Sequence, residues 1–207
     1  MSIKVKICGI TNYEDAKTAT NVGVDALGFI FYTKSPRCIH PVQAREIIKR
    51  LPPFVSRVGV FVNDDAETIM SIVQQTGIDT IQLHGDELPS LCEQLPLTTI
   101  KAFSVGADFD ANMLDKYPVN GYLLDTWNDS LKGGSGKTFD WSIARTITQY
   151  RHNIILAGGL GPTNISEALE AVQPYAVDFN SGVEIKPGLK NPRKMRDAVN
   201  IVKAWKK

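Results

Sequence analysis

Lys6-Ile7-Cys8-Gly9-Ile10-Thr11 places a cysteine at the end of an apolar run, where a glycine and a threonine turn the chain toward a helical pattern. In α/β proteins, the carboxyl ends of the strands are where ligands meet the chain. A thiol there, beside the free N–H groups of a following helix, has a lowered pKa and can exist as a thiolate. A free cysteine is also a common buried strand residue, so the rest of the chain must decide between these interpretations.

Working outward from this stretch, short apolar runs alternate with amphipathic ones from end to end. The apolar runs are rich in Val, Ile and Phe and apolar throughout, as in parallel strands that are covered on both faces. We expect strands over 3–10, 26–32, 57–62, 80–83, 99–103, 122–124, 154–157 and 176–179. We expect helices over 13–21, 41–51, 66–75, 88–95, 111–116, 141–150, 165–172 and 192–205.

Three helix starts carry capping signals. Asn164-Ile-Ser-Glu167 resembles a capping box, with a side-chain oxygen followed three residues later by a glutamate. Asp140 is a candidate N-cap for the helix that starts at Trp141, and Asp64 or Asp65 is one for the helix after Asn63.

Eight strand–helix units in 207 residues give about 26 residues each, which suits a βα repeat with short loops. Eight such units that close on themselves form a (β/α)8 TIM barrel of the α/β class. The alternative is an open doubly wound sheet, but the first turn holds only one glycine, Gly9, and no dinucleotide fingerprint. No linker or shift in composition divides the chain, so we expect residues 1–207 to form a single barrel domain.

The composition is that of an ordinary globular protein, with 43% hydrophobic and 22% charged residues. A net charge of +1 gives no basic field for nucleic acid, and no apolar run approaches the length of a membrane span. Three cysteines at irregular spacing indicate neither a disulfide framework nor a zinc site, and favour a reducing compartment. We expect a cytoplasmic protein that binds a small molecule, without nucleic acid, membrane or metal.

Two short glycine-containing pairs point to an anion site. Gly158-Gly159 follows the seventh expected strand, and Ser181-Gly182 follows the eighth. The loops after strands seven and eight form the common phosphate site of these barrels, because backbone N–H groups can approach phosphate oxygens there. Gly133-Gly-Ser-Gly136 could fold over the same region as a flap. The simpler alternative is that these glycines only turn tight corners.

A second set of residues suits proton transfer. Cys8 and Asp125 end the first and sixth expected strands and would face each other across the barrel mouth. A thiolate can act as a general base, and a carboxylic acid next to the apolar 122–124 run can act as a general acid. The alternative for Asp125 is a helix cap or a loop carboxylate. His84 is either a second titrating or orienting group, or a structural histidine.

These residues lie within motifs that resemble those of the phosphoribosylanthranilate isomerase family. The resemblance opens with 6–11 and continues in order along the chain. It runs through Gly28-Phe-Ile-Phe31, Ser35-Pro-Arg37, Val58-Gly-Val-Phe-Val-Asn63, Gln82-Leu-His-Gly-Asp86, Ile100-Lys-Ala-Phe103, Leu123-Leu-Asp125, Gly133-Gly-Ser-Gly136, Phe139-Asp-Trp141, Leu156-Ala-Gly-Gly-Leu160, Ser181-Gly-Val-Glu184 and Pro187-Gly188. One departure is Asn180, in Asp178-Phe-Asn-Ser181, where the family usually has serine.

The resemblance implies a TIM-barrel isomerase of tryptophan biosynthesis that performs an Amadori rearrangement without cofactor or metal. It converts N-(5-phosphoribosyl)anthranilate to 1-(2-carboxyphenylamino)-1-deoxyribulose 5-phosphate. By motif, Cys8 is the general base and Asp125 the general acid, and Arg37 pairs with the anthranilate carboxylate. Further matching positions are phosphate ligands or surround the site: Gly158, Gly159, Ser181, Gly182, His84, Asp178 and Glu184. The protein would be a monomer or a homodimer.

The same barrel could serve three other functions. A metal-dependent sugar-phosphate epimerase needs several histidine ligands at strand ends, where only His84 is available, and a histidine-pathway isomerase uses a pair of aspartates where this chain has Cys8. A non-catalytic sensor of a phosphorylated ligand would need the glycines but neither Cys8 nor Asp125.

Overall fold

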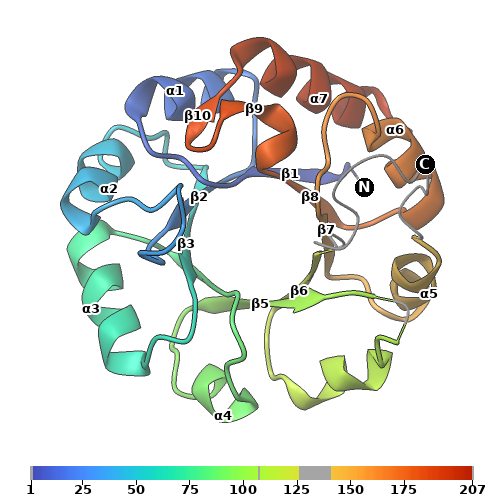
Figure 1. Cartoon of the computed structure of the whole chain (residues 1–207), viewed down its shortest axis with the longest axis horizontal. Helices are drawn as coiled ribbons and strands as arrows, with labels where there is room; N and C mark the ends of the chain where they lie inside the picture. The colour runs from blue at the N-terminus through green and yellow to red at the C-terminus, as the bar shows by residue number, and fades with distance from the viewer. Residues whose placement is uncertain (1, 107, 126–140, 207) are drawn as a thin grey trace.

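The computed structural model describes residues 2–106, 108–125 and 141–206, and its central feature is a closed barrel of eight parallel strands in chain order (Figure 1). The barrel strands are β1 (Lys4–Ile7), β2 (Ala26–Ile30), β3 (Ser56–Phe61), β4 (Thr80–Leu83), β5 (Thr98–Ser104), β6 (Gly121–Asp125), β7 (Ile154–Ala157) and β8 (Ala176–Phe179). Closure comes from pairing of β1 with β8, with Lys6 opposite Asp178 in the register. The expected (β/α)8 barrel is confirmed.

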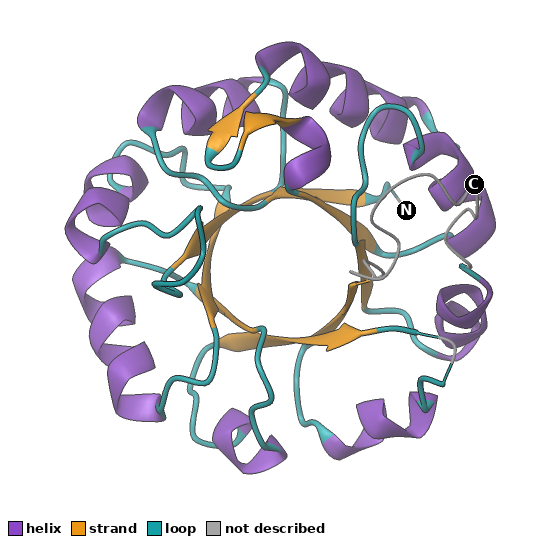
Figure 2. Cartoon of the chain, viewed as in Figure 1, coloured by secondary structure: helices purple, strands orange, loops and turns teal. Residues whose placement is uncertain are grey.

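Helices form a ring outside the strands (Figure 2). They are α1 (Tyr13–Asn21), α2 (Pro41–Ile48), α3 (Ala66–Thr76), α4 (Pro89–Cys92), the 3-10 helix η1 (Ala111–Lys116), α5 (Ser142–Tyr150), α6 (Ile165–Val172) and α7 (Pro192–Ala204). After β8 the chain adds a 3-10 turn, η3 (Ser181–Val183), and a small antiparallel hairpin of β9 (Glu184–Lys186) and β10 (Leu189–Lys190). None of the helices that the structure describes is long and apolar enough to cross a membrane.

The expected elements are all present, but several end earlier than the apolar pattern indicates. β1 stops at Ile7 because Gly9 adopts a φ of +74°, which breaks the extended backbone, so Cys8 directly follows the strand. α2 and α4 stop short of Leu51 and Leu95. Each of these leucines precedes a proline, which disfavours helical backbone at that position.

One of the helix-capping predictions is confirmed and one is wrong. Asp65 caps α3 by accepting a hydrogen bond from the Thr68 N–H at 2.8 Å, as predicted. The capping box at Asn164 is wrong: its side chain makes no cap hydrogen bond and instead contacts the loop after β7. Asp140 and the 133–136 loop lie outside the described residues.

The pleat of the strands separates two apolar clusters. Residues facing outward, such as Ile7, Phe29 and Phe179, share one large core with the helices. Residues facing inward form a smaller cluster within the barrel, of Ile100, Ala102, Leu123, Ile155, Ala157 and Ala176. Because side chains alternate along a strand, each strand sends its last inward residue to the carboxyl-terminal mouth.

Candidate active site

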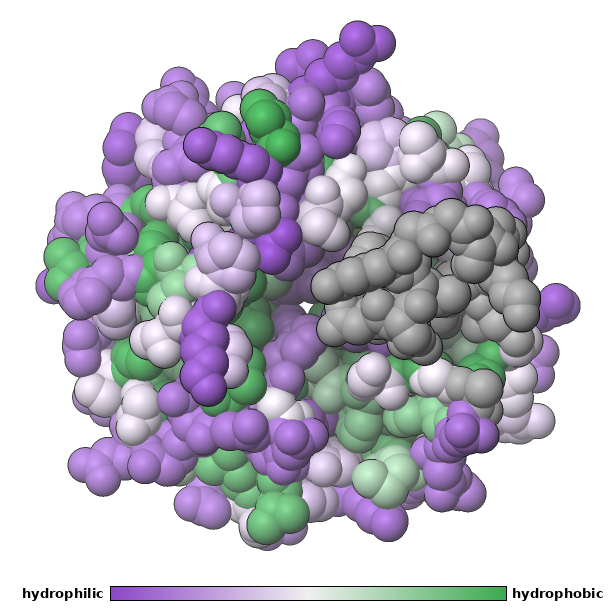
Figure 3. Space-filling model, viewed as in Figure 1, coloured by the Kyte–Doolittle hydropathy of each residue, from purple (hydrophilic) through white to green (hydrophobic). Residues whose placement is uncertain are grey.

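The mouth of the barrel holds a cavity of about 440 Å³, which lies at the hollow in the middle of the face seen in Figure 3. Of the ten residues that the sequence assigns to the site or its surroundings, Glu184 does not line it and eight do: Cys8, Arg37, His84, Asp125, Gly158, Gly159, Asp178 and Ser181. The remaining walls include Ile30, Tyr32, Val60, Gln82, Ala157 and Asn180. Gly182 does not line the cavity.

Cys8 lies on the wall formed by β1 and β2. Its N–H donates to the carbonyl of Phe179, which continues the β1–β8 pairing by one residue. Gly28 of β2 leaves room for the thiol, because a Cβ there would lie 2.8 Å from Sγ. Only 3% of Cys8 is exposed, and this burial raises the pKa of its thiol, although Lys6 counteracts part of the effect.

The expected lowering of the Cys8 pKa by a helix N-terminus is therefore wrong. α1 begins only at Tyr13, and the side chain of its N-cap residue, Asn12, accepts a hydrogen bond from the Asp15 N–H. The charge that lowers the thiol pKa comes instead from a lysine side chain inside the barrel, and burial outweighs it.

That lysine, Lys6, forms a buried ion pair with Asp178. Its Nζ lies 2.6 Å from Asp178 Oδ2, and each side chain is about 5% exposed. Burial lowers the Lys6 pKa, but the charges of Asp178 and Cys8 outweigh burial, so that pKa is raised and the side chain stays charged. The pKa of Asp178 is raised because burial outweighs the attraction of Lys6. The second oxygen of Asp178, Oδ1, is buried and has no hydrogen-bond partner within 2–106, 108–125 and 141–206.

On the opposite wall, Asp125 ends β6 and contacts the histidine that follows β4. His84 Nε2 lies 3.4 Å from Asp125 Oδ2, and both side chains are about one-third exposed. Gln82 Nε2 lies 2.9 Å from His84 Nδ1. When the amide donates to Nδ1, the ring proton resides on Nε2 and faces Asp125. Gln82 Oε1 is a second buried acceptor to which no described residue donates.

The glycine loops after β7 and β8 lie against each other. Gly158 and Gly159 have φ values of +96° and +63°, so the backbone turns sharply at the end of β7. A Cβ on Gly182 would lie 2.1 Å from the carbonyl oxygen of Leu160, so only glycine permits this close approach. Asn164 fixes the first loop by accepting from the Gly161 N–H and donating to the Gly159 carbonyl.

These loops present unused backbone donors. Among the described residues, the N–H groups of Gly158, Gly159, Ser181 and Gly182 make no hydrogen bond. Ser181 and Gly182 begin the 3-10 turn η3, where the first N–H groups have no partner within the turn. Neighbouring free N–H groups on glycine-rich backbone are the usual chemistry of an anion site.

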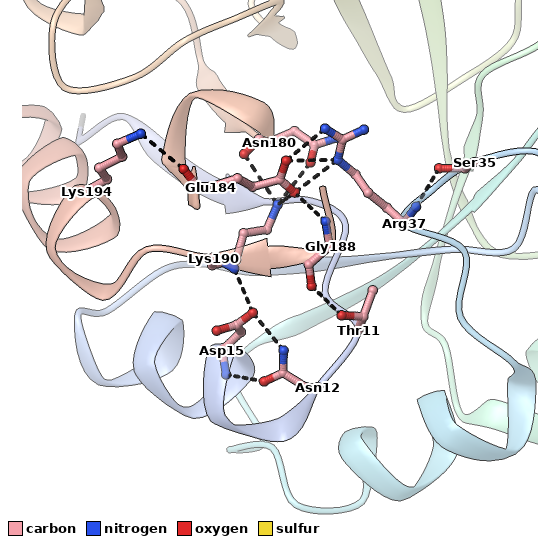
Figure 4. Close-up of polar contacts among 10 residues, drawn as sticks. All are labelled: Thr11, Asn12, Asp15, Ser35, Arg37, Asn180, Glu184, Gly188, Lys190 and Lys194. Carbon is pink, nitrogen blue, oxygen red and sulfur yellow. Dashed lines mark hydrogen bonds and ion pairs between the residues drawn. The ribbon is translucent and has the colours of Figure 1, made fainter. Parts of the chain in front are cut away.

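Arg37 reaches the cavity rim from the β2–α2 loop and is held from behind (Figure 4). Its Nε and Nη2 donate to both oxygens of Glu184, with Nη2 at 2.8 Å from Oε2. Lys190, completely buried, donates from Nζ to Glu184 Oε1 and to Asn180 Oδ1. Burial raises the Glu184 pKa, but hydrogen bonds from Arg37 and Lys190 outweigh it and hold that pKa below its usual value.

The hairpin that carries Glu184 and Lys190 is itself fixed to the start of the chain. The Lys190 N–H donates to Asp15 Oδ2 of α1, and Thr11 Oγ1 donates to the Gly188 carbonyl (Figure 4). The 6–11 stretch and the 181–190 segment therefore form one support beneath Arg37. Asn180, the departure noted in the sequence, belongs to this support through its contact with Lys190.

Lys6, Gln82 and Lys190 belong to the site and were not identified from the sequence. The signal for the first two is a polar residue within an otherwise apolar buried strand, at a position with inward parity. Lys190 carries no comparable signal, because a lysine between a glycine turn and a helix is usually exposed. In the part of the chain that the structure describes, no three His, Cys, Asp or Glu side chains gather as metal ligands would.

Comparison with known proteins gives one consistent family. The family model described as N-(5'phosphoribosyl)anthranilate (PRA) isomerase matches residues 5–201. The N-(5'-phosphoribosyl)anthranilate isomerase of Trichlorobacter lovleyi is 47% identical over 201 residues, which cover 97% of this chain and 98% of the relative.

Solved structures agree with the sequence comparison. The phosphoribosyl anthranilate isomerase of Thermotoga maritima is 42% identical, with a TM-score of 0.89 over 98% of this chain and 100% of that one. A further structure, 39% identical with a TM-score of 0.86, covers 98% of this chain and 100% of the other. It is a phosphoribosyl anthranilate isomerase in complex with reduced 1-(o-carboxyphenylamino)-1-deoxyribulose 5-phosphate.

The buried Glu184 carboxylate between two cations yields a stability prediction. Glu184→Gln should lower the free energy of unfolding by about 3–5 kcal/mol, because it leaves Arg37 and Lys190 without their shared anion. Since the folded-state pKa of Glu184 is lowered, its contribution is present above the pKa of the unfolded state and is lost as the pH falls through the folded-state pKa. Urea unfolding at several pH values measures both effects.

The matched control is Glu46→Gln, which removes the exposed partner of Lys49 and should leave stability nearly unchanged, because exposed ion pairs contribute little. A Glu184→Gln protein as stable as this control at neutral pH would contradict the role given to Glu184.

Proposed function

The chain belongs to the N-(5'-phosphoribosyl)anthranilate isomerase family of tryptophan biosynthesis, and we propose that Cys8 and Asp125 carry out its reaction from opposite walls of the cavity. Because the chain belongs to this family, we set aside the alternatives of an epimerase and of a non-catalytic sensor. What supports the residue roles most is one observation: the same cavity is lined by Cys8, Asp125, Arg37 and the glycine loops.

The substrate is proposed to span the cavity between two anion sites. The 5′-phosphate lies on the N–H groups of Gly158, Gly159, Ser181 and Gly182, which have no other partner among the described residues. The anthranilate carboxylate pairs with Arg37, whose planar fork suits a carboxylate and which Glu184 holds at the rim. A complex of a 39% identical isomerase with a reduced product analogue supports this ligand chemistry.

The ribose then lies between Cys8 and Asp125. Asp178 and Gln82 line this part of the cavity, and their side chains are proposed to accept hydrogen bonds from the hydroxyl groups of the sugar.

The reaction begins with the acid. Asp125 donates a proton to the ring oxygen of the aminoaldose as the bond between that oxygen and C1′ breaks. The nitrogen lone pair forms the C1′=N bond of a Schiff base, and the ring oxygen leaves as a hydroxyl group. His84, 3.4 Å from Asp125 and fixed by Gln82, orients the carboxyl group for this transfer.

The base acts in the second step. The Cys8 thiolate takes the proton from C2′, and the electron pair of that C–H bond forms C1′=C2′ while the iminium electrons return to nitrogen. The enolamine then tautomerises to the ketone, with a proton delivered to C1′. The net change moves hydrogen within one molecule, so no oxidant or reductant is consumed.

Other expectations from the sequence stand as parts of this proposal. Residues 1–207 act as one domain, without cofactor or metal, on a small phosphorylated aminosugar. A Thermotoga maritima relative is described as dimeric, and we keep monomer or homodimer for this chain.

Removal of either proton-transfer group tests the mechanism. Cys8→Ser and Asp125→Asn should each lower kcat by about 100-fold or more, the usual scale of acid–base catalysis. Loss of substrate fluorescence measures turnover. Cys38→Ser and the exposed Asp108→Asn make the same chemical changes elsewhere and should retain full activity. A Cys8→Ser enzyme with near-normal turnover removes the thiolate from the mechanism.

Ligands with and without the aromatic carboxylate distinguish a binding role of Arg37 from a structural one. Arg37→Ala should weaken binding of analogues that bear the aromatic carboxylate by about 1.5–3 kcal/mol, the scale of a charge-assisted hydrogen bond. Analogues without that carboxylate should bind nearly as before, because Glu184 keeps Lys190 as a partner. Calorimetric titration of both ligand types measures the difference. Equal losses for both would make Arg37 a structural residue only.

The phosphate site predicts an asymmetry between neighbouring substitutions. Gly159→Val should weaken binding of ribose 5-phosphate at least about tenfold, because a side chain blocks the approach of phosphate oxygens to the N–H groups. Ser181→Ala keeps its N–H and should cost much less. Gly77→Val imposes similar backbone strain at φ +81° on α3, away from the cavity, and should leave binding unchanged. Equal losses in all three would contradict the assignment.

A further inference from the structure

Three ionisable side chains lie together where β1 and β8 meet: Cys8 and Asp178, which line the cavity, and Lys6. Lys6 and Cys8 are two residues apart at β1, so both face inward. Asp178 lies directly opposite Lys6 in the β1–β8 register. The proposed function uses Cys8 as the base and Asp178 as a hydrogen-bond acceptor, but it leaves Lys6 without a task.

Lys6 lies against Cys8 as well as Asp178. A Cβ on Gly28 would contact both Cys8 Sγ, at 2.8 Å, and Lys6 Cε, at 3.2 Å, so the two side chains meet over this glycine. The ammonium group has three protons, and its one hydrogen bond to a carboxylate goes to Asp178 Oδ2. Its positive charge therefore lies between a carboxylate and the thiol.

Stability alone does not explain the buried ion pair of Lys6 and Asp178. Two charges in the barrel interior lose their hydration, and an apolar pair of similar size is often as stable or more so. Asp178 Oδ1 also receives no hydrogen bond from the residues that the structure describes, which adds to this cost. The buried Lys6 charge has this free-energy cost, and its presence beside the thiol is explained if it stabilises the thiolate that forms when Cys8 loses its proton.

We infer that Lys6 is the fixed counter-ion of the Cys8 thiolate and that Asp178 holds Lys6 in place while limiting how strongly its charge acts on the sulfur. Lys6 is a positioning residue, since it acts through Cys8 and keeps its own proton. When Cys8 takes the C2′ proton, the thiolate becomes a thiol and the ammonium is unchanged. The role of Lys6 in catalysis rests on the proposed function, but its effect on the thiol does not.

The charges around Cys8 predict the direction in which each substitution should shift its ionisation. Lys6 on β1 and Lys190 on β10 favour the thiolate, and Asp178 on β8 disfavours it. From β2, only Gly28 and Ile30 face the thiol side of the wall, and neither is charged. Arg37, His84 and Asp125 line the same cavity farther around its wall. Removing Lys6 and removing Asp178 should therefore move the ionisation of Cys8 in opposite directions.

The test is the rate of alkylation of Cys8 by iodoacetamide as a function of pH, followed on the Cys8 peptide by mass spectrometry. Lys6→Met should move the midpoint of this profile upward by roughly one to three pH units, and Asp178→Asn should move it downward. The acidic limb of kcat/KM should shift in the same directions.

Two controls separate charge from packing. Lys101→Met removes another buried lysine of a lysine–carboxylate pair, 3.1 Å from Glu87 on the outward side of β5, and should leave the Cys8 profile in place. Cys38 in each variant should alkylate with an unchanged profile. Where Lys6→Met does not fold, Lys6→Gln takes its place, and Asp178→Asn tests the sign independently.

An unchanged midpoint in the Lys6 variants, or an upward shift in Asp178→Asn, overturns the inference. If the alkylation shifts occur but Cys8→Ser retains full turnover, the counter-ion inference stands and the assignment of Cys8 as the base fails. The two failures are therefore distinguishable.

Discussion

The alternation of side chains along eight parallel strands, closed into a ring, is the constraint on which the site depends. It sends every second residue inward, so that the ends of β1, β4, β6, β7 and β8 supply one cavity with groups far apart in the chain. The same geometry removes water from the inward groups near the mouth. Burial raises the Cys8 pKa, and Lys6 is charged there because Asp178 accompanies it. The closed barrel therefore both brings these groups together and imposes the free-energy cost of burying them.

In the proposed binding mode, backbone N–H groups recognise one end of the substrate and a side chain recognises the other. At β7 and β8, glycines allow loops to approach so closely that a single Cβ on Gly182 would collide with a neighbouring carbonyl. The free N–H groups there need no side chain. At β2 the anion partner is a side chain, Arg37, and its position requires a supporting carboxylate, Glu184, which in turn requires Lys190. The hairpin after β8 thus contributes to both ends of the site.

Much of the fold could be predicted from the sequence, since buried parallel strands read as continuous apolar runs and helices as periodic ones. Element ends were less certain because they depend on local backbone, as at Gly9, where β1 stops early. Cys8, Asp125 and the glycine pairs were identifiable because they directly follow or end strands. Lys6 and Lys190 were not, because their functions arise from partners about 170 and 6 residues away, Asp178 and Glu184, and their burial is visible only in three dimensions. The same holds for the Cys8 pKa, whose direction is set by burial and not by the helix that follows.

The most direct test is a crystal structure of this protein with a reduced product analogue in the cavity. The phosphate oxygens should accept hydrogen bonds from the N–H groups of Gly159 and Ser181, and the aromatic carboxylate should pair with Arg37. C2′ should then lie within roughly 3–4 Å of Cys8 Sγ, with Asp125 on the opposite side of the sugar. A ligand bound in the reverse direction, or with C2′ turned away from Cys8, would contradict the division of acid and base between β6 and β1.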